Sequence, residues 1–554
     1  MSNTATDPRA AITPAAAVAL LAACGGGGGD SAAVAAPPPA AATSPTDAEA
    51  ARFLGQAGFG ATDVLIARVK TLGYGGWLDE QFAAPRTQSH YDWMLAKGYG
   101  IEANINSFAG TDNTLWRKWI SSPDVLRQRM TLALSEIFVV SMAGLPVAWR
   151  GFIAAAYVDV LEANAFGTYR DLLQAVTLSP GMGVYLNMRG NQKADANTGR
   201  VPDENYAREV LQLFSLGLVE LNTDGSLKRD ANSKPLETYS QDTISGLARV
   251  FTGWDYDGFS RVETSHAQRP MMVNTTRHEA GEKRFLGTVV TAGTPPAAAL
   301  QQALNTIAAH PNVAPFLSRQ LIQRLVSSNP SAAYVGRVAA VFNNNGSGVR
   351  GDLKALLRAV LLDTEARSAP GNSSNSNDST RGKLREPLLR FVQWARTFSV
   401  ASPTDLWNVG NLSDPATRLG QSPLRSPSVF NFFRPGYVPP NSALGMQGIT
   451  APEFQITNES SVVGWVNYAQ TFVVSGAGEL RPNYTAELAL ADDAVALVRR
   501  VALMLAADAL PANTLDTITQ AVASIAATSD AGRSNRVYAA VHLVLCAPDY
   551  LVQI

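Results

Sequence analysis

The segment PDENYAREVLQLFSLG, residues 202–217, gathers side chains suited to acid–base chemistry at its start. Glu204 and Glu209 can donate or accept a proton, and Arg208 can hold a carboxylate or an oxyanion. Glu204 and Arg208 are four residues apart, which places them on one face of a helix. Glu204 and Glu209 lie about 140° apart around the helix axis at 3.6 residues per turn. A working pair therefore needs a second carboxylate from elsewhere in the chain.

Two further residues are candidates to complete such a site. Asp242 lies in SQDTISGLARVFTGW and shares a helix face with Arg249, seven residues on. Two acid–arginine pairs between two helices either tune a carboxylate for catalysis or fix the packing of the helices. His278 opens the loop HEAGEKRFLG, where it acts as a general base, a metal ligand or a loop-fixing hydrogen-bonding group. The predicted catalytic residues are Glu204, Arg208, Glu209, Asp242 and His278.

The segment 202–217 also supports a purely structural interpretation. Asp203 can cap a helix, and Gly217 can end it. The Glu204–Arg208 pair has the favourable acid-before-base order, and acids near the start complement the positive end of the helix. An apolar stripe for packing consists of Tyr206, Val210, Leu213 and Phe214. In this interpretation the segment is a capped amphipathic helix with no catalytic role.

Composition and motifs exclude several classes of function. Lys+Arg is 45 and Asp+Glu is 46, and no long basic run occurs, so nucleic acid is not an expected partner. The five histidines show no HExxH spacing, and no common zinc site is predicted. The chain has no GxSxG nucleophile elbow and no phosphate-binding loop. No cofactor is identified from the sequence.

The N-terminal region has the features of a lipoprotein signal. The run AAITPAAAVALLAAC is apolar but too short for a membrane span, as in the core of a signal peptide. It ends at Cys24 in a sequence that resembles a lipobox. We expect residues 1–24 to be a signal peptide, Cys24 to be lipidated, and residues 25–46 to be a flexible Gly/Ala/Pro spacer. Gly25 follows the cysteine, a pattern that resembles lipoproteins sent to the outer membrane. The expected location is therefore the cell envelope, with a lipid anchor.

Helical periodicity dominates the rest of the chain, and sustained period-two alternation is rare. The predicted fold is mainly α: a single large multi-helical domain over residues 47–554, with long irregular loops at 187–202, 255–295, 366–381 and 412–450. The predicted helices include residues 129–141, 149–167, 243–254, 295–310, 312–326, 331–346, 352–363, 384–398, 493–510 and 533–546.

Six segments occur in an order that resembles a known bacterial family. They are ARFLGQAGFGAT (51–62), PDENYAREVLQLFSLG (202–217), ARVFTGW (248–254), HEAGEKRFLG (278–287), HPNVAPFLSRQLIQRLV (310–326) and SPSVFNFFRPGY (426–437). Together they resemble domain of unknown function 1800. The resemblance implies an exported protein without an established activity. It also implies a possible exported partner of the domain of unknown function 1501 family, whose genes often neighbour those of the 1800 family.

Two functions from different classes follow from these observations. The first is a lipid-tethered helical scaffold or assembly factor that binds another envelope or secreted protein, which predicts an exposed apolar or aromatic patch near residues 426–437. The alternative is a carboxylate- or metal-assisted hydrolase of an envelope polymer. That alternative predicts one concave pocket that brings together the five candidate catalytic residues.

Overall fold

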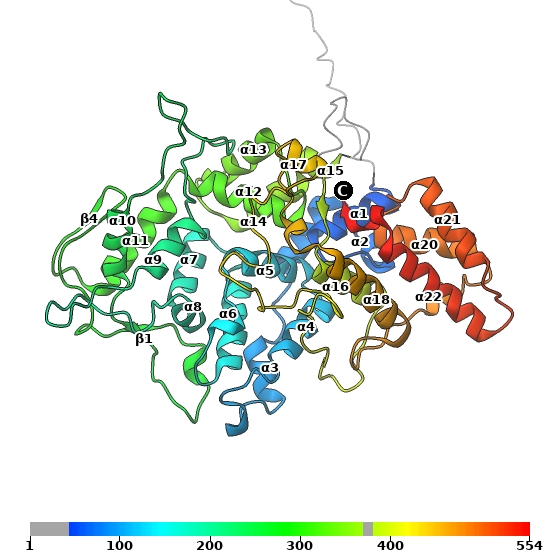
Figure 1. Cartoon of the computed structure of the whole chain (residues 1–554), viewed down its shortest axis with the longest axis horizontal. Coiled ribbons are helices and arrows are strands. Elements are labelled where there is room, and N and C mark those ends of the chain that lie inside the picture. The colour runs from blue at the N-terminus through cyan, green and yellow to red at the C-terminus, as the bar shows by residue number, and fades with distance from the viewer. Residues whose placement is uncertain (1–43, 369–380) are drawn as a thin grey trace, which may run out of the picture. The chain divides into compact units, whose positions relative to one another are not determined.

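The structure, a computed structural model, describes residues 44–368 and 381–554 (Figure 1). Helices dominate this part of the chain, and the strands in it form only two-stranded antiparallel pairs, so the predicted mainly α class is confirmed. The expected signal peptide with Cys24 and most of the expected spacer lie outside the described residues. The predicted loop at 366–381 lies largely outside them as well.

The helices of the described residues have the following bounds: α1 Asp47–Ala57, α2 Asp63–Ala83, α3 His90–Ala96, α4 Thr111–Ser121, α5 Val125–Ile137, α6 Arg150–Asn164, α7 Tyr169–Leu178, α8 Pro180–Tyr185, α9 Asn205–Gln212, α10 Gln241–Val250, α11 Pro296–Ala309, α12 Val313–Leu325, α13 Ala332–Asn343, α14 Leu353–Leu362, α15 Thr364–Arg367, α16 Pro387–Thr397, α17 Ala443–Met446, α18 Glu459–Ser475, α19 Thr485–Leu488, α20 Ala494–Ala506, α21 Ala512–Ala523, α22 Asp530–Cys546 and α23 Pro548–Leu551. The strands are β1 Trp254–Asp255, β2 Met272–Val273, β3 Lys283–Phe285, β4 Thr288–Val290, β5 Lys383–Leu384 and β6 Val552–Gln553. Short 3₁₀ turns are η1 Glu102–Asn104, η2 Met142–Gly144, η3 Ser265–Ala267 and η5 Pro452–Ile456.

Capping side chains and apolar periodicity explain where these helices begin and which face they bury. The Ser331 side chain accepts a hydrogen bond from the Tyr334 amide at the start of α13. The Asp352 side chain accepts from the Lys354 and Ala355 amides at the start of α14. Both helices then bury residues three and four apart, so each presents one continuous apolar face. For α14 this face consists of Leu353, Leu356, Leu357, Val360 and Leu361.

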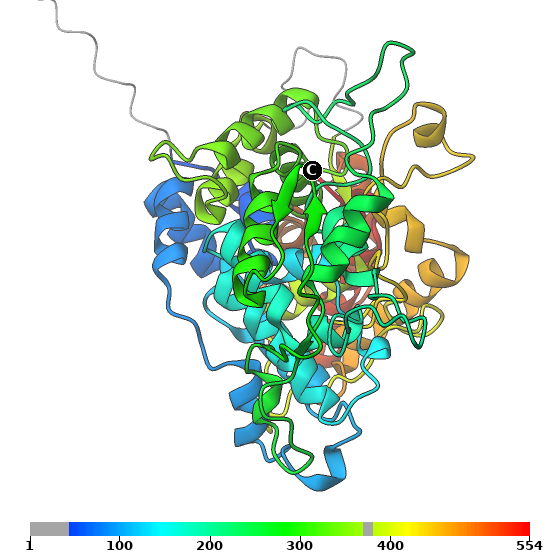
Figure 2. The same ribbon diagram turned by 90° about the vertical axis from the view of Figure 1, so that its left-hand side faces the viewer.

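Each strand pair either forms a hairpin or joins segments that are distant along the chain. β1 pairs with β2 through Trp254 and Val273, and β3 pairs with β4 in a tight hairpin (Figure 2, green). The hairpin packs on α10, where a Cβ added at Gly246 would collide with the Arg284 backbone. β5 pairs with β6, which sets Lys383 opposite Gln553 near the chain's end. This last pair holds a buried lysine in the interior of the protein.

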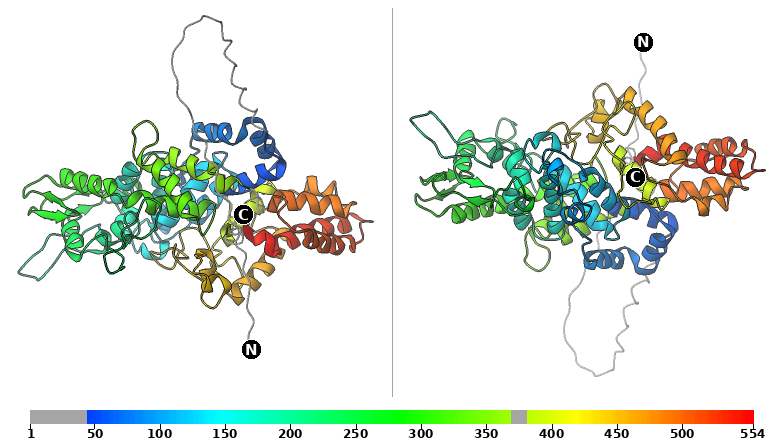
Figure 3. Two further views of the ribbon diagram at one scale, coloured as in Figure 1. Left: turned by 90° about the horizontal axis from the view of Figure 1, so that it is seen from above. Right: turned by 90° about the horizontal axis from the view of Figure 1, so that it is seen from below.

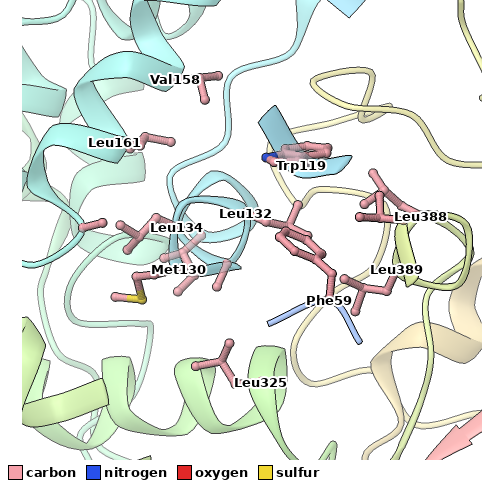
Figure 4. Packing of buried hydrophobic residues seen from close by; sticks show 14 of the residues in the cluster. Phe59, Trp119, Met130, Leu132, Leu134, Val158, Leu161, Leu325, Leu388 and Leu389 are labelled. Atoms are coloured by element: carbon pink, nitrogen blue, oxygen red, sulfur yellow. The ribbon is translucent and has the colours of Figure 1, made fainter. Parts of the chain in front are cut away.

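Buried apolar side chains from α1 to α23 form one hydrophobic core. Five fully buried tryptophans contribute the largest side chains, namely Trp77, Trp116, Trp119, Trp149 and Trp394. Figure 4 shows part of this core, where Trp119 lies close to Leu132 of α5 and Leu388 of α16. The helices α20, α21 and α22 pack on one another and form one group in both views of Figure 3 (orange to red). Among the described residues, none of the helices combines the length and apolarity required to cross a membrane.

Candidate functional site

The first half of the segment 202–217 forms a polar cluster between α9 and α10. Glu204 precedes α9 and accepts hydrogen bonds from the Ser245 hydroxyl at 2.6 Å and the Gln241 amide at 2.7 Å. Arg208 Nη2 lies 3.3 Å from Glu204 Oε2, as the four-residue spacing predicts, and 3.5 Å from Gln241 Oε1. The Ser245 hydrogen bond lowers the pKa of Glu204, with smaller contributions from Gln241 and Arg208. The cluster thus holds Glu204 ionised and ties the two helices together.

The helix in this segment is shorter than the sequence predicts. α9 covers Asn205–Gln212, and turns continue from there to Gly217, which has a φ of 73°. Asp203, the expected cap, accepts a hydrogen bond from the Asn205 amide at 2.8 Å, while Glu204 occupies the cap position without a side-chain cap. Gly217 is required because its φ favours glycine and because a Cβ there would meet the Phe316 ring.

Asp242 and Arg249 do not form the predicted network. Asp242 is exposed, and no hydrogen bond or ion pair of this side chain occurs in the described part of the chain. Arg249 is also exposed and donates to the Glu282 carbonyl at 3.4 Å, away from Glu204. The α9–α10 contact relies instead on Gln241 and Ser245, two neutral residues that the sequence reasoning missed.

Glu209 is buried in surroundings different from those of Glu204. Its side chain is buried, and Oε2 has no hydrogen-bond partner among the described residues. Burial raises the pKa of Glu209, and Arg208 opposes the rise. Burial, together with the nearby Glu209 carboxylate, raises the pKa values of Tyr185 and Tyr239 to about 12. The two glutamates therefore have different surroundings and do not act as a pair.

His278 fixes a loop against the far end of α10. The ring is buried, and Nδ1 lies 2.8 Å from the Thr252 carbonyl, to which it donates. The Thr252 hydroxyl accepts from the Glu279 amide at 2.8 Å, and Gly253 packs directly against the His278 backbone. Burial lowers the pKa of His278. These contacts match the loop-fixing interpretation of this histidine.

The five predicted residues do not share one cavity. Gln241, which contacts Glu204, begins α10, whereas Thr252, which contacts His278, follows its end. The two contacts are eleven positions apart along the chain, which corresponds to about 16 Å at the helical rise of 1.5 Å per residue. Of the five, Glu204 and Arg208 form an ion pair. The structure therefore does not bring the five residues together as the hydrolase hypothesis expects.

A cluster of potential metal ligands lies between α3 and α6. Ligand atoms of His90, Asp159 and Glu162 lie within 4.8 Å of one another. Lys118 Nζ, however, contacts both Glu162 oxygens at 2.7 and 2.6 Å, and the Asp159 oxygens accept the His90 and Tyr91 amides. The acids are thus already satisfied, and the Lys118 ammonium repels a cation. We interpret the cluster as a buried ion-pair site that fastens α3 and α4 to α6.

A second buried charged cluster, termed the central network here, lies where α5, α12, β5 and α16 meet. It consists of Arg129, Glu136, Arg324, Lys383, Glu386 and Glu453, all buried. Arg324 Nε lies 3.4 Å from Glu136 Oε2. Lys383 Nζ lies 3.6 Å from Glu386 Oε1 and 3.3 Å from Glu453 Oε1. Arg129 Nη2 and Lys383 Nζ both donate to the Arg324 carbonyl, at 2.6 and 2.9 Å.

Glu136 and Glu386 interact directly and have opposite pKa shifts. Burial raises the pKa of Glu136 well above its ordinary value, and the neighbouring Glu386 raises it further. Burial opposes ionisation of Glu386 as well, but Lys383, the hydrogen bond with Glu136, and Arg129 outweigh it and lower its pKa to about 2. Gln421 also donates to Glu386 Oε2 at 2.7 Å. The pKa values of the two carboxyl groups are therefore shifted in opposite directions, which favours the proton on Glu136, a distribution found in acid–base sites.

The sequence reasoning missed this pair, although a signal for it exists. Glu136 is the only acid within the apolar run of α5, and Glu386 directly precedes the apolar helix α16. An acid at a core-facing position requires a buried partner. What the sequence does not indicate is that these two acids, so far apart along the chain, are partners of each other.

A groove of about 450 Å³ lies where three of the six motif segments meet. Leu216 and Gly217 come from the end of the segment 202–217, and Leu218 directly follows it. The segment 310–326, which contains α12, contributes Phe316, Arg319, Gln320 and Gln323, and the segment 426–437 contributes Pro435 and Gly436. Val219, Leu221 and Leu227 extend the apolar lining. Gln323 is buried, its amide donates to the Ser328 and Pro435 carbonyls, and its Oε1 has no partner among the described residues.

The aromatic run at 426–437 is packed rather than exposed, so the predicted aromatic patch is wrong at this position. Phe433 is buried beneath the Arg324 guanidinium, 4.8 Å from its ring centroid, and Phe430, Phe432 and Tyr437 are half-buried. Exposed apolar side chains lie instead beside the groove, where Leu218 is 56% and Leu227 40% exposed. The accessible apolar surface in this region thus belongs to the groove.

Comparison with known proteins gives one match. A family model described as "Protein of unknown function (DUF1800)" matches residues 52–552, nearly all of the chain. No curated protein and no solved structure matches the chain.

Proposed function

The chain belongs to the DUF1800 family, and from this premise we propose that the protein is a helical scaffold that binds an extended segment of another exported protein in the groove. The observation that carries the proposal is the meeting of three family-like segments around one apolar groove. Residues that occupy three distant parts of the chain supply its walls. A groove of this size accommodates several side chains of a peptide, which is typical of peptide-recognition surfaces.

The polar atoms of the groove favour an extended peptide over a compact apolar ligand. Gln323 Oε1 is a buried acceptor without a partner, and a peptide N–H is the donor that would satisfy it. Arg319 stands at the groove and donates to the Gly225 carbonyl at 3.1 Å, which leaves other donors of its guanidinium for a carbonyl or carboxylate of the occupant. Leu218 and Leu227 offer apolar contact for alternate side chains.

The proposal places this binding in the cell envelope. A lipidated Cys24 and the following spacer would tether the helical unit to a membrane, with the outer membrane favoured by Gly25. The proposed partner is an exported protein of the domain of unknown function 1501 family. A tether raises the local concentration of the groove near such a partner, so a weak contact suffices for assembly.

A binding measurement with groove variants tests this function. Leu218→Asp places a charge against the apolar groove, and we expect at least a tenfold loss of affinity for the neighbouring 1501-family protein. Leu95→Asp is the matched control, because Leu95 is 43% exposed on α3 and does not line the groove. Equal affinity of the two folded variants would remove the groove from the function.

A carboxylate-assisted hydrolase remains the second candidate, and one observation favours it. Glu136 and Glu386 are two glutamates in direct contact whose pKa values are shifted in opposite directions, as in pairs that serve as acid and base. The cavity beside Glu136 measures about 20 Å³, enough for one or two water molecules and far too small for a sugar or peptide unit. Polymer cleavage at this pair therefore requires a large movement of the covering segment 421–432, which makes the scaffold the better-supported function.

A further inference from the structure

The cavity beside Glu136 is lined by polar atoms that lack hydrogen-bond partners. Among the residues lining it, Ser426 Oγ and Asn431 Nδ2 are buried and have no hydrogen-bond partner in the described part of the chain, and Glu136 is a third buried polar residue of the lining. All three residues are less than 7% exposed. Leaving a buried polar atom without a partner is unfavourable, so several such atoms around one cavity indicate a common ligand. Trp119, Leu132 and Leu388 provide its apolar walls (Figure 4).

The volume of the cavity restricts the size of that ligand. About 20 Å³ exceeds the roughly 10–15 Å³ that one water molecule requires and excludes larger organic groups. Buried water typically makes about three hydrogen bonds. Three such partners line the cavity: Glu136 from α5, and Ser426 and Asn431 from the covering segment 421–432.

The charges around Glu136 determine which partner donates a proton. Arg129, Arg324 and Lys383 face Glu136, Glu386 and Glu453 in the central network. The network contains three cationic and three acidic side chains, so a proton on Glu136 leaves it with one positive charge in excess. Ionisation of Glu136 would neutralise that charge but place two carboxylates in contact, away from water. Burial and Glu386 both raise the pKa of Glu136, whereas Arg324 and Lys383 oppose the rise.

Backbone strain supports a specific role for this wall. Leu424 and Asn431, both of which line the cavity, have φ values of 51° and 61°. Asparagine tolerates this left-handed conformation, whereas in leucine it is strained. The Leu424 carbonyl accepts the Met142 amide at 2.8 Å, and the Ser426 carbonyl accepts the Ser141 hydroxyl at 2.7 Å. These bonds hold the segment over the cavity, against α5 and its continuation.

We propose that Glu136, Ser426 and Asn431 form a buried acid site that holds one water molecule, while the Glu136 proton is directed to Glu386. The Asn431 amide donates to this water, and the water donates to a Glu136 oxygen and to the Ser426 hydroxyl. Glu386 stays ionised and holds Lys383. This inference does not depend on the groove or on the proposed scaffold function, because no groove residue takes part.

Infrared spectroscopy of the full-length protein tests the acid site. A protonated carboxyl has a C=O stretching band separate from that of carboxylates, and we expect the folded protein to retain such a band at pH 8. Glu136→Gln should remove the band and leave the fold intact, because glutamine reproduces the shape of a protonated glutamate. Glu204→Gln is the control and should leave the band unchanged, because Ser245 keeps Glu204 ionised. Absence of the band in the wild type, or its persistence in Glu136→Gln, would overturn the protonated state.

A second variant tests the bound water. In Ser426→Ala the band should remain but shift to a different wavenumber, because the water that contacts Glu136 loses one of its three partners. Deuterium exchange gives the matching measurement: the wild-type band should downshift in D₂O, since the acid proton exchanges through the bound water. An identical band position in Ser426→Ala and the wild type would show that water does not bridge the two residues and would refute the site.

Discussion

Replacing each glutamate of the central pair by glutamine should have unequal effects on stability. Glu136→Gln preserves the neutral form that the folded protein already holds, and we expect its free energy of unfolding at pH 7 to change by less than about 1 kcal/mol. Glu386→Gln removes the carboxylate that faces Lys383 at 3.6 Å and accepts from Gln421 at 2.7 Å. Breaking a buried ion pair costs about 3–5 kcal/mol. The lower end applies, because Glu136 can then ionise and take over part of the charge.

This difference is large enough for thermal unfolding to detect. An unfolding entropy of about 2.1 cal/mol/K per residue gives about 1 kcal/mol/K for a folded unit of roughly 500 residues. A loss of about 3 kcal/mol then lowers the Tm of Glu386→Gln by about 3 °C, whereas Glu136→Gln should stay within about 1 °C. Differential scanning calorimetry at pH 7 measures both. Equal losses in the two variants would refute the assignment of the proton to Glu136.

The double variant extends the same reasoning. With both acids neutral, Lys383, Arg129 and Arg324 face only the Glu453 carboxylate in this network. We therefore expect Glu136→Gln/Glu386→Gln to lose more stability than the sum of the single variants, because neither acid can take over the charge. Strict additivity would mean that the two carboxyl groups do not share a charge.

Three further predictions concern the other polar sites. Ser245→Ala should lower the free energy of unfolding in urea by about 1 kcal/mol, because it removes a hydrogen bond to Glu204. The control Asp242→Asn, at an exposed position, should leave this free energy unchanged. An equal loss in both variants would show that the α9–α10 cluster does not stabilise the fold. Burial lowers the pKa of His278, so the unfolded chain binds more protons at this residue and stability is lost as the pH falls below about 6.5. His278→Gln should weaken this loss in a series of thermal scans from pH 7 to 5. An unchanged dependence of Tm on pH would contradict a buried neutral ring. Lys118→Met removes the ammonium group that contacts the buried Glu162 and should lower the free energy of unfolding by about 3–5 kcal/mol. The control Lys354→Met, at an exposed position, should have a small effect. A loss below about 1 kcal/mol in Lys118→Met would show that Glu162 does not depend on Lys118.

Local patterns were sufficient to predict the helices but not the sites. Residues 312–326 were expected to be helical, and α12 covers Val313–Leu325, because both the apolar spacing and the ends of the helix are local properties. The Glu204–Arg208 contact was predictable for the same reason. α9 is shorter than expected because the turns before Gly217 serve the packing against Phe316, which no local pattern specifies.

The remaining features depend on contacts between distant segments. Asp242 has the residue type of a catalytic acid, yet Ser245 and Gln241 reach Glu204 because of how α10 packs on α9. Glu136 and Glu386 become a pair only once α5 and α16 meet in the core. The groove likewise exists only where the end of α9, α12 and the 435–450 segment converge. Each of these features follows from tertiary packing, which periodicity and spacing alone do not determine.

The most direct test of the scaffold function is site-specific photo-crosslinking in the cell envelope. A photoreactive residue at Leu227, in the groove, should crosslink to a 1501-family protein, whereas the same residue at Val495, 47% exposed on α20 and outside the groove, should not. Mass spectrometry of the crosslinked product identifies the partner and its contact segment. Crosslinking from Leu227 to an extended segment of that protein is the predicted result. No crosslink from Leu227, or equal yields from both positions, would contradict binding in the groove.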